Sequence, residues 1–530
     1  MSSARVKRWL LFGAGASLVG ACILSTTVRG RSLTFARGQT VRVQSPLKVH
    51  LRDGSVVVFR DGATVRDDSI AGNGVRYSVA LAGHEQTSAI PLDSVLGAET
   101  FRNELNPGRT LAYTLGATAL TITAIVGIKA LFGSCPTIYS DSAGTPVLDA
   151  ESFSYSIAPL LAKRDLDRLR AQPDSTGVLR LEVRNEALET HYIDQLELIE
   201  VRAREGEEVF PEPHGDPVAI ALLAPPVSAR DRAGRDLRRI LAAVDQSVFS
   251  TSEATLAHAI DAGDTDTETD ATQDWIDLAI PRAGVGDSLA IALTMRSSLL
   301  TTVLFYDYML ARPGARSLDW MASDLARITT LAKLARWYTG KLGLRIAVRD
   351  GDGWRQTARL ADFGPIAWRN VAVVVPARSA PGDDSVRVRL SFLADQWRID
   401  RVAISPVVRR LAQRRIPLAR VRTPAGEERR AVRDALVRAD ASQLSTEPGD
   451  RFVAEFDVGK PLLAADERRT FFLAAQGYYV EWVRGAWLQT PRDSMAFDPQ
   501  HASTADLLRS WRSAKDSLEA RFFAARVPVQ

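Results

Sequence analysis

Closely spaced carboxylates are the first candidates for chemistry in this chain of 530 residues. Asp264, Asp266, Glu268 and Asp270 alternate with threonine, and oxygens at alternate positions can surround a calcium ion. The sixth-position glycine and the terminal glutamate of a helix–loop–helix calcium site are both missing, so a solvated acidic linker is favoured. No other pair of carboxylates is identified by sequence as an acid and a base. We therefore predict no catalytic residue, and we favour a non-enzymatic protein while leaving an enzyme open.

Metal-binding side chains are sparse. The only two cysteines, Cys22 and Cys135, are too few for a disulfide framework or a thiolate zinc site. His50 and His84 stand singly, with no second ligand at metal-binding spacing. No nucleotide-binding or hydrolase fingerprint is present. The sequence predicts no metal and no cofactor, and it favours a buried structural role for Cys135.

Aromatic rings near the C-terminus are the candidate ligand-binding residues. Tyr478, Tyr479, Trp482 and Trp487 lie close together in the sequence, and rings exposed on a β-sandwich can stack on sugars. The two tyrosines would point to opposite faces of a strand, so one of them could be exposed. Aromatic rings at alternating strand positions more often pack in the core, so core packing is favoured for these rings and sugar binding is the alternative. Three other tryptophans recur in the strand-rich region: Trp354, Trp368 and Trp397.

Arginines form the densest basic run, between residues 409 and 433. Glu427, Glu428 and Asp434 interrupt or border the run, so we favour a solvated helix-and-loop face, with an anionic surface as the alternative and no nucleic-acid partner. The overall basic balance adds little, because residues 1–21 carry three basic groups and their removal lowers the net charge from +4 to +1. The run comprises Arg409, Arg410, Arg414, Arg415, Arg420, Arg422, Arg429, Arg430 and Arg433.

The N-terminus has the order of a secretory signal, a basic start followed by an apolar stretch that ends in small residues. Residues 19–22 read VGAC, and this segment resembles the lipobox of bacterial lipoproteins, in which the cysteine thiol is diacylated and the preceding bond is cut. The resemblance implies a signal peptide over 1–21, lipidation at Cys22 and an anchor or linker over 22–37. Ile23, in place of aspartate, argues against retention at an inner membrane. An uncleaved signal anchor is the alternative.

A small β-barrel-like domain is predicted over residues 38–109. Asp53-Gly54 and Asp61-Gly62 lie between apolar runs and predict hairpin turns, because glycine accepts a positive φ. The strand candidates around these turns are followed by IPLDSV at residues 90–95. Together these features resemble small SH3-like or Sm-like barrels, which are commonly adaptors.

Residues 110–132 form a hydrophobic segment. As a helix, residues 111–132 would extend about 33 Å, near the hydrocarbon thickness of a bilayer. Thr114, Thr118, Thr121 and Thr123 lower the hydrophobicity of the segment, although threonine hydroxyls can bond within a helix. We expect a transmembrane helix, with a core helix buried between two domains as the alternative.

The rest of the chain predicts a β-rich body. CPTIY at residues 135–139 and RNEALETHYID at 184–194 resemble motifs of a group of uncharacterised bacterial envelope proteins, and the likeness extends to residues 477–482. The resemblance implies an architecture and no activity. We expect a β-rich domain over 133–265, a β-sandwich with a helical insertion over 273–420, and a β/α region over 421–530. The fold class is therefore mainly β with inserted helices, with one or two antiparallel sandwiches.

Alternation of apolar and charged residues locates the strands of this body, and spacings of three and four locate its helices. A helix capped by Ser317 and stopped by Gly340 is expected, and another from about Ser503 to before Pro528. The principal strand candidates are residues 179–184, 289–293, 303–306, 344–348, 371–375, 386–392, 452–456 and 470–473.

These features together predict a membrane-anchored protein of the bacterial cell envelope, on the outer membrane or the periplasmic face, with a binding or structural role toward a protein or glycan. Two alternatives remain open. One is a glycan-binding or glycan-processing envelope protein. The other is a two-span membrane protein whose body lies in the cytoplasm.

Overall fold

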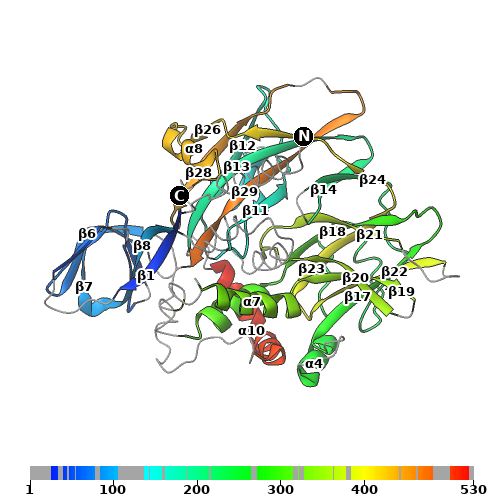
Figure 1. The fold of residues 1–530 in the computed structure, drawn as a ribbon, viewed down its shortest axis with the longest axis horizontal. Helices are drawn as coiled ribbons and strands as arrows, with labels where there is room; N and C mark the ends of the chain where they lie inside the picture. The colour runs from blue at the N-terminus through cyan, green and yellow to red at the C-terminus, as the bar shows by residue number, and fades with distance from the viewer. Residues whose placement is uncertain are drawn as a thin grey trace, which may run out of the picture.

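The computed structural model has mainly antiparallel β structure with a few helices, as the mainly β fold class predicts (Figure 1). The residues that it describes are 26–33, 40–44, 47–53, 55–77, 84–105, 136–142, 144–157, 161–187, 189–213, 216–263, 271–313, 320, 327–351, 353–361, 363–377, 384–440, 443–460, 463–481 and 502–524. Cys22, Cys135, residues 110–132 and the acidic residues 264–270 lie outside them, so the predictions made there stay predictions.

The N-terminal region forms one curled antiparallel sheet, drawn in blue in Figure 1. Its strand order is β1-β8-β3-β4-β6-β5-β2, and β7 also pairs with β6. The strands are β1 (Thr26–Leu33), β2 (Val41–Val43), β3 (Leu47–Leu51), β4 (Val56–Phe59), β5 (Ala63–Arg66), β6 (Ser69–Tyr77), β7 (His84–Pro91) and β8 (Val95–Leu105). A single-turn 3-10 helix (Leu92–Ser94) joins β7 to β8.

Of the two predicted hairpins in this sheet, one forms. β3 pairs with β4, and the Leu51 N–H donates to the Ser55 carbonyl across the turn at 2.9 Å. The turn at Asp61-Gly62 instead joins β4 to β5, which do not pair with each other; both pair with successive stretches of β6. Gly62 has a φ of 81°, as its turn requires. β1 lies inside the predicted linker over 22–37, yet it pairs with β8 along its whole length.

A first sandwich follows, made of two sheets with a shared apolar core. One sheet has the order β10-β9-β12-β28-β26, and the other has β11-β29-β13-β25, with β27 also paired to β13. Leu179, Leu181 and Val183 of β12 point into the core, as their alternation with charged residues predicts. The strands are β9 (Thr137–Ser142), β10 (Thr145–Glu151), β11 (Lys163–Arg168), β12 (Val178–Arg184), β13 (Glu189–Arg204), β25 (Gln413–Pro417), β26 (Arg420–Arg422), β27 (Leu444–Thr446), β28 (Arg451–Asp457) and β29 (Glu467–Glu481).

A second sandwich is built from residues between these strands. Its outer sheet has the order β16-β17-β22-β19-β20, and its inner sheet has β21-β18-β23. A small sheet, β14-β15-β24, packs on the inner sheet through Phe210, Val218 and Ile220 against Ala290 and Ala292. The strands are β14 (Glu207–Pro211), β15 (Pro217–Ala221), β16 (Ser228–Asp231), β17 (Gln273–Pro281), β18 (Ser288–Ser297), β19 (Leu344–Asp350), β20 (Gly353–Leu360), β21 (Arg369–Pro376), β22 (Ser385–Leu393), β23 (Trp397–Ser405) and β24 (Val408–Arg410).

The first sandwich is discontinuous in sequence. The chain forms β9 to β13, leaves to build the second sandwich, and returns with β25 to β29. β12 pairs with β28 and β13 pairs with β29, so two sheets cross the domain boundaries predicted near 265–273 and 421. The N-terminal sheet meets this sandwich at β13, where Lys48 Nζ donates to Thr190 Oγ1 at 2.5 Å and both residues are buried.

The C-terminal helix, α4 (Glu253–Ala262) and α7 (Ile328–Lys341) lie at the lower side of Figure 1, whereas α8 (Arg430–Leu436) lies at the upper left, beside β26. The predicted C-terminal helix is confirmed as α10 (Thr504–Ala524), with the Ser503 hydroxyl accepting from the Asp506 N–H at its start. The predicted strand at 303–306 is wrong. Ser298 caps α5 (Leu299–Val303), which continues into a π-helical segment, η3 (Leu304–Leu310), since a short apolar run fits a buried helix as well as a strand.

Of the predicted helix capped by Ser317, the second half forms α7, which begins after Arg327; that residue has extended backbone (φ −81°, ψ 128°), so the helix does not run unbroken from residue 317. Among the described residues, no helix combines the length and apolar character needed to cross a membrane.

Candidate functional site

The predicted aromatic site is buried where the structure describes it. Tyr478 and Tyr479 lie on β29, in the middle of a sheet, and both are 0% exposed. The Tyr478 ring stacks on Tyr192 with a centroid separation of 4.9 Å, and Tyr479 meets the edge of His191. Neither ring is open to a sugar, because both faces of the strand are covered. Trp482 and Trp487 lie outside the described residues.

The predicted arginine run faces carboxylates on neighbouring strands. β24, β25 and β26 carry most of its guanidinium groups, and the carboxylates that pair with them lie on β14, β13 and β28. These ion pairs offset the positive charge along the run and join strands within each sheet. They join Arg409 to Glu207, Arg414 to Glu200, Arg415 to Glu197, Arg420 to Glu455 and Asp457, and Arg422 to Glu455.

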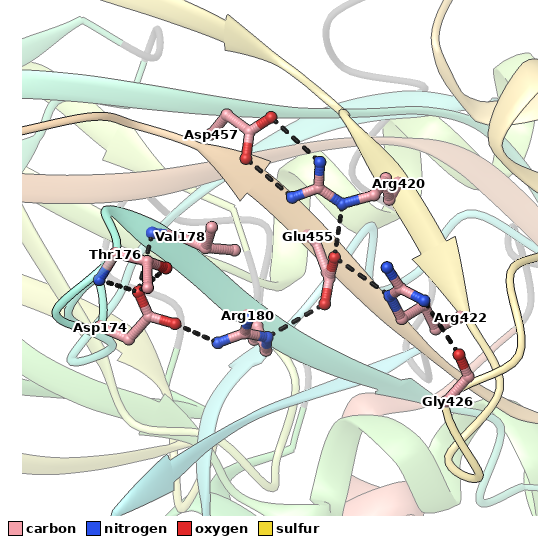
Figure 2. A network of polar contacts seen from close by, with 9 residues as sticks. All are labelled: Asp174, Thr176, Val178, Arg180, Arg420, Arg422, Gly426, Glu455 and Asp457. Carbon is pink, nitrogen blue, oxygen red and sulfur yellow. Dashed lines mark hydrogen bonds and ion pairs between the residues drawn. The ribbon is translucent and has the colours of Figure 1, made fainter.

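Figure 2 shows one dense network of this kind, centred on Glu455 of β28. Its carboxylate accepts from Arg180 Nε at 3.0 Å, Arg420 Nε at 2.8 Å and Arg422 Nε at 3.3 Å. Burial acts to raise the pKa of Glu455, but the three guanidinium groups hold that pKa below its ordinary value. Asp174 pairs with Arg180 at the end of the network. A carboxylate saturated in this way ties β12, β28 and β26 together and is not poised to accept a proton.

A second charged cluster lies where the two sandwiches meet. Asp165 and Asp167 are two residues apart on β11, so both side chains project from one face of the strand. Arg369, at the start of β21, donates to Asp165 at 3.0 Å and lies 2.9 Å from Asp167. Lys163 lies 3.3 Å from Asp165. The exposed fractions of the Asp165, Asp167 and Arg369 side chains are 12%, 3% and 12%. We name these four residues the joint cluster.

Glu151 extends this contact between the sandwiches. Its carboxylate accepts the backbone N–H groups of Ile366 and Ala367 at 2.9 and 3.1 Å, and Arg369 donates to its backbone carbonyl. A Cβ added at Gly364 would lie 2.0 Å from the Glu151 carboxyl carbon. The loop before β21 therefore closes over Glu151, and glycine at residue 364 is required by space.

The two aspartates of the joint cluster have different pKa values. Burial raises the pKa of Asp167 to about 7; the positive charge of Arg369 lowers this pKa, and the negative charge of Asp165 raises it. For Asp165, burial is outweighed by Lys163 and Arg369, and the pKa lies below its ordinary value. Two carboxyls with separated pKa values are the pattern of an acid and a base. Here they lie between two sandwiches with little exposed surface, and ion pairs with Lys163 and Arg369 give them a structural role in the described part of the chain.

His191 and Glu189 form another acid–base pair that sequence reasoning did not single out. His191 Nε2 lies 2.9 Å from Glu189 Oε1, and both side chains are 0% exposed. Burial lowers the pKa of His191 to about 3, so the imidazole is neutral at physiological pH. The two residues are two apart on β13, and that spacing is the signal that could have found them.

An open polar surface occurs on the outer sheet of the second sandwich. Trp354, Arg389, Trp275 and Arg232 form a row in which rings and guanidinium groups alternate. Arg389 lies 4.5 Å from the Trp354 ring centroid and 4.6 Å from that of Trp275, and Arg232 lies 4.7 Å from Trp275. Trp354 is 38% exposed. We name these four residues the tryptophan–arginine row.

The row contains one of the three tryptophans that recur in the strand-rich region. Trp397 is fully buried, and Trp368 is half-buried beneath Arg296. Trp275 was not singled out by sequence, although its alternation with the buried Ile276 and Leu278 places it on the outward face of β17. Among the described aromatics of the predicted sites, Trp354 alone is more than one-third exposed.

The described residues include no group of three or more histidine, cysteine, aspartate or glutamate side chains arranged to hold a metal ion.

Comparison with known proteins gives no family. No protein-family model matches the chain, and the search of curated proteins finds no match. The chain is similar at 10% identity to a carbohydrate-binding module from Cellvibrio mixtus lichenase 5A solved with cellotriose, over 41% of this chain and 97% of that one, with a TM-score of 0.13. It is similar at 10% identity to an α-xylosidase from Xanthomonas citri over 84% of this chain and 38% of that one, with a TM-score of 0.14. A structure of infectious bursal disease virus, Gt strain, is 11% identical over 94% of this chain and 88% of that one, with a TM-score of 0.15. Likenesses this slight carry no argument about function.

Proposed function

We propose that this protein is a membrane-anchored, non-enzymatic component of the bacterial cell envelope, whose β-rich body binds or organises a partner. The anchor part rests on the signal-like residues 1–21 and on Cys22 in its lipobox-like context. The proposed location is the outer membrane or the periplasmic face.

One observation carries the non-enzymatic part of the proposal. In the described residues, the main clusters of charged groups act as cross-links, either between strands, as at Glu455, or between the sandwiches, as at Arg369. Catalysis needs titratable groups within reach of a substrate. The joint cluster and the His191–Glu189 pair have suitable chemistry, but none of their side chains is more than 14% exposed. This favours a rigid scaffold over a reacting site.

The anchor is tested by replacing Cys22 with serine in the full-length protein. We expect loss of the acyl mass at the N-terminus, retention of residues 1–21, and release from or altered extraction of the membrane fraction. A Cys135→Ser variant serves as the matched control and should leave mass and extraction unchanged apart from the substitution. An unaltered acyl mass in the Cys22 variant would refute the lipobox.

Protease access in intact cells separates the proposed location from the two-span alternative. Cleavage within residues 134–530 from outside, after the outer membrane is opened, supports a body on the envelope side. Protection under those conditions, lost only when the inner membrane is broken, would support a cytoplasmic body and overturn the proposed location.

A specific observation favours the glycan-binding alternative over glycan processing. The tryptophan–arginine row offers an exposed ring, whereas glycoside hydrolysis needs two carboxyls about 5–10 Å apart beside the sugar. On the described outward face of this sheet, Asp277 is pinned by two hydrogen bonds from Arg389, each 2.7 Å long. Release of reducing ends from a polysaccharide by the full-length protein would overturn this preference.

A further inference from the structure

The outward face of the outer sheet is strongly basic. The strand register fixes which side chains share this face, because residues paired across strands project to the same side. Among the described residues of β16, β17, β22, β19 and β20, six arginines and one aspartate project outward. They are Arg230, Asp277, Arg345, Arg349, Arg359, Arg387 and Arg389.

Only part of this face is open. Near the C-terminal end of α7, Arg359 donates to the Leu342 carbonyl at 2.5 Å, and Arg345 donates to the Gly340 carbonyl. These two guanidinium groups are occupied by backbone carbonyls. Arg230, Arg349 and Arg387 are exposed, and they lie beside the tryptophan–arginine row. Arg230 also donates to the Gly234 carbonyl at 2.9 Å and Arg349 to the Gly351 carbonyl at 3.3 Å, and the other N–H groups of these two exposed guanidinium groups are the ones that face solvent. The open part of the face therefore combines excess positive charge with an exposed ring.

The tryptophan–arginine row is held in place before any ligand arrives. Asp277 fixes Arg389 through two hydrogen bonds, and the Ala271 carbonyl accepts from Arg232 at 2.9 Å. Trp275 lies between Arg389 and Arg232 in the row, and each of these two guanidinium groups is within 5 Å of the Trp275 ring centroid. Trp354 stands at the open end, on the edge strand β20. A fixed ring loses little entropy on binding a ligand.

Resting on the proposed binding function, we propose that the open part of this face binds an acidic polysaccharide, a glycan whose sugar rings carry carboxylate groups. The negatively polarised face of Trp354 stacks against the C–H groups of a sugar ring. The exposed arginines at residues 230, 349 and 387 bind its carboxylates, for which the planar guanidinium group has matching geometry. Charge complementarity selects an anionic glycan over a neutral one, because six arginines face one aspartate.

The proposal is tested by calorimetric titration of the detergent-extracted, full-length protein with polygalacturonate. An uncharged glucan of matched length and a single-stranded oligodeoxynucleotide are the comparison ligands. We expect binding to polygalacturonate that weakens with added salt, and little binding to either comparison ligand. Trp354→Ala should weaken binding by about tenfold or more, while Trp354→Phe should retain most of it. Arg387→Ala should weaken binding by about two- to fivefold, as expected for an exposed ion pair.

The matched control is Arg410→Ala. Arg410 is 77% exposed on β24, away from the outer sheet, and its loss should leave the affinity unchanged. The proposal is overturned if polygalacturonate does not bind, or if the neutral glucan or the oligodeoxynucleotide binds equally well. It is also overturned if neither Trp354→Ala nor Arg387→Ala weakens the binding of polygalacturonate. If binding is absent while Cys22 remains acylated and the protein still captures an envelope partner elsewhere, this inference fails and the proposed function stands. Release of reducing ends would instead refute the non-enzymatic part of the proposed function.

Discussion

Replacing Arg369 with methionine tests whether the joint cluster holds the two sandwiches together. Methionine keeps an unbranched apolar stem but removes the cation that lies within 3.0 Å of Asp165 and Asp167. Breaking a buried ion pair from one side costs about 3–5 kcal/mol, because it leaves carboxylates buried without their partner. The 12% exposure of Arg369 leaves little room for solvent to screen this loss. Lys163 still faces Asp165, so we expect a loss of about 3 kcal/mol at pH about 7.5.

The raised pKa of Asp167 determines how the stability should change with pH. The pKa of Asp167 is raised to about 7, above the value of about 3.9 in an unfolded chain. Between these values the folded protein holds a proton that the unfolded chain releases, so the contribution of Asp167 to stability falls as the pH rises through this window. Loss of Arg369 raises the pKa of both carboxyls, because its positive charge lowers the pKa of each in the wild type. The variant should therefore recover stability relative to the wild type as the pH falls toward about 5.

Urea unfolding at the two pH values, followed by hydrogen exchange of residues 363–369, measures this effect. Arg389→Met is the matched control, because it removes a guanidinium group whose Asp277 partner is 38% exposed, and it should cost about 1 kcal/mol or less with little pH dependence. A destabilisation by Arg369→Met that is absent, or equal at both pH values, would refute the reasoning.

Three further predictions concern other parts of the body. Glu455→Ala should destabilise the protein by about 1–3 kcal/mol in urea unfolding. The control, Asp457→Ala, removes a side chain that is 55% exposed and should cost no more than about 1 kcal/mol. Equal effects would contradict the central place of Glu455 in the network. In the wild type, stability should fall as the pH drops from about 6.5 toward 3, because the unfolded chain protonates His191 in this range while the folded pKa is lowered to about 3. His191→Gln should make the unfolding free energy less dependent on pH in this range. An unchanged pH profile would count against a neutral buried imidazole. Gly364→Ala should lower the unfolding free energy by about 1–3 kcal/mol, because the added Cβ clashes with Glu151. The control, Gly340→Ala, has open space around its Cβ inside α7 and should raise the unfolding free energy by about 0.5–1 kcal/mol. An unchanged unfolding free energy for Gly364→Ala would show that Glu151 moves aside freely.

Local patterns in the sequence predicted many single elements of the body. Strands at 179–184 and 386–392 were predictable, because alternate residues face a core and the solvent, and that period of two is written directly in the chain. The C-terminal helix was predictable from its serine cap and apolar spacing. The run at 303–306 was not, because Val303 and Leu304 fit either a strand or a buried helix, and packing decided for the helix.

The candidate binding face was only half visible in the sequence. Alternation placed Arg387 and Arg389 on a solvent-facing side and singled out Trp354 as recurrent, but it gave no reason to join them to Trp275. Trp275, Trp354 and the two arginines lie on three strands, and residues on different strands are more than thirty positions apart along the chain; hydrogen bonding between the strands brings them together. Likewise, the sequence allowed one of Tyr478 and Tyr479 to be exposed, but packing on both faces of β29 buries both.

The sequence by itself determined the mainly β character, the faces of many strands and the signal-like N-terminus, because each of these depends on neighbouring residues in a short segment. Tertiary structure alone decided which strands share a sheet, that the first sandwich is completed only when the chain returns, and which charges are buried as cross-links. Such pairings depend on contacts such as Arg369 with Asp165, about two hundred residues apart, whose register is set by the whole sheet and not by any local pattern.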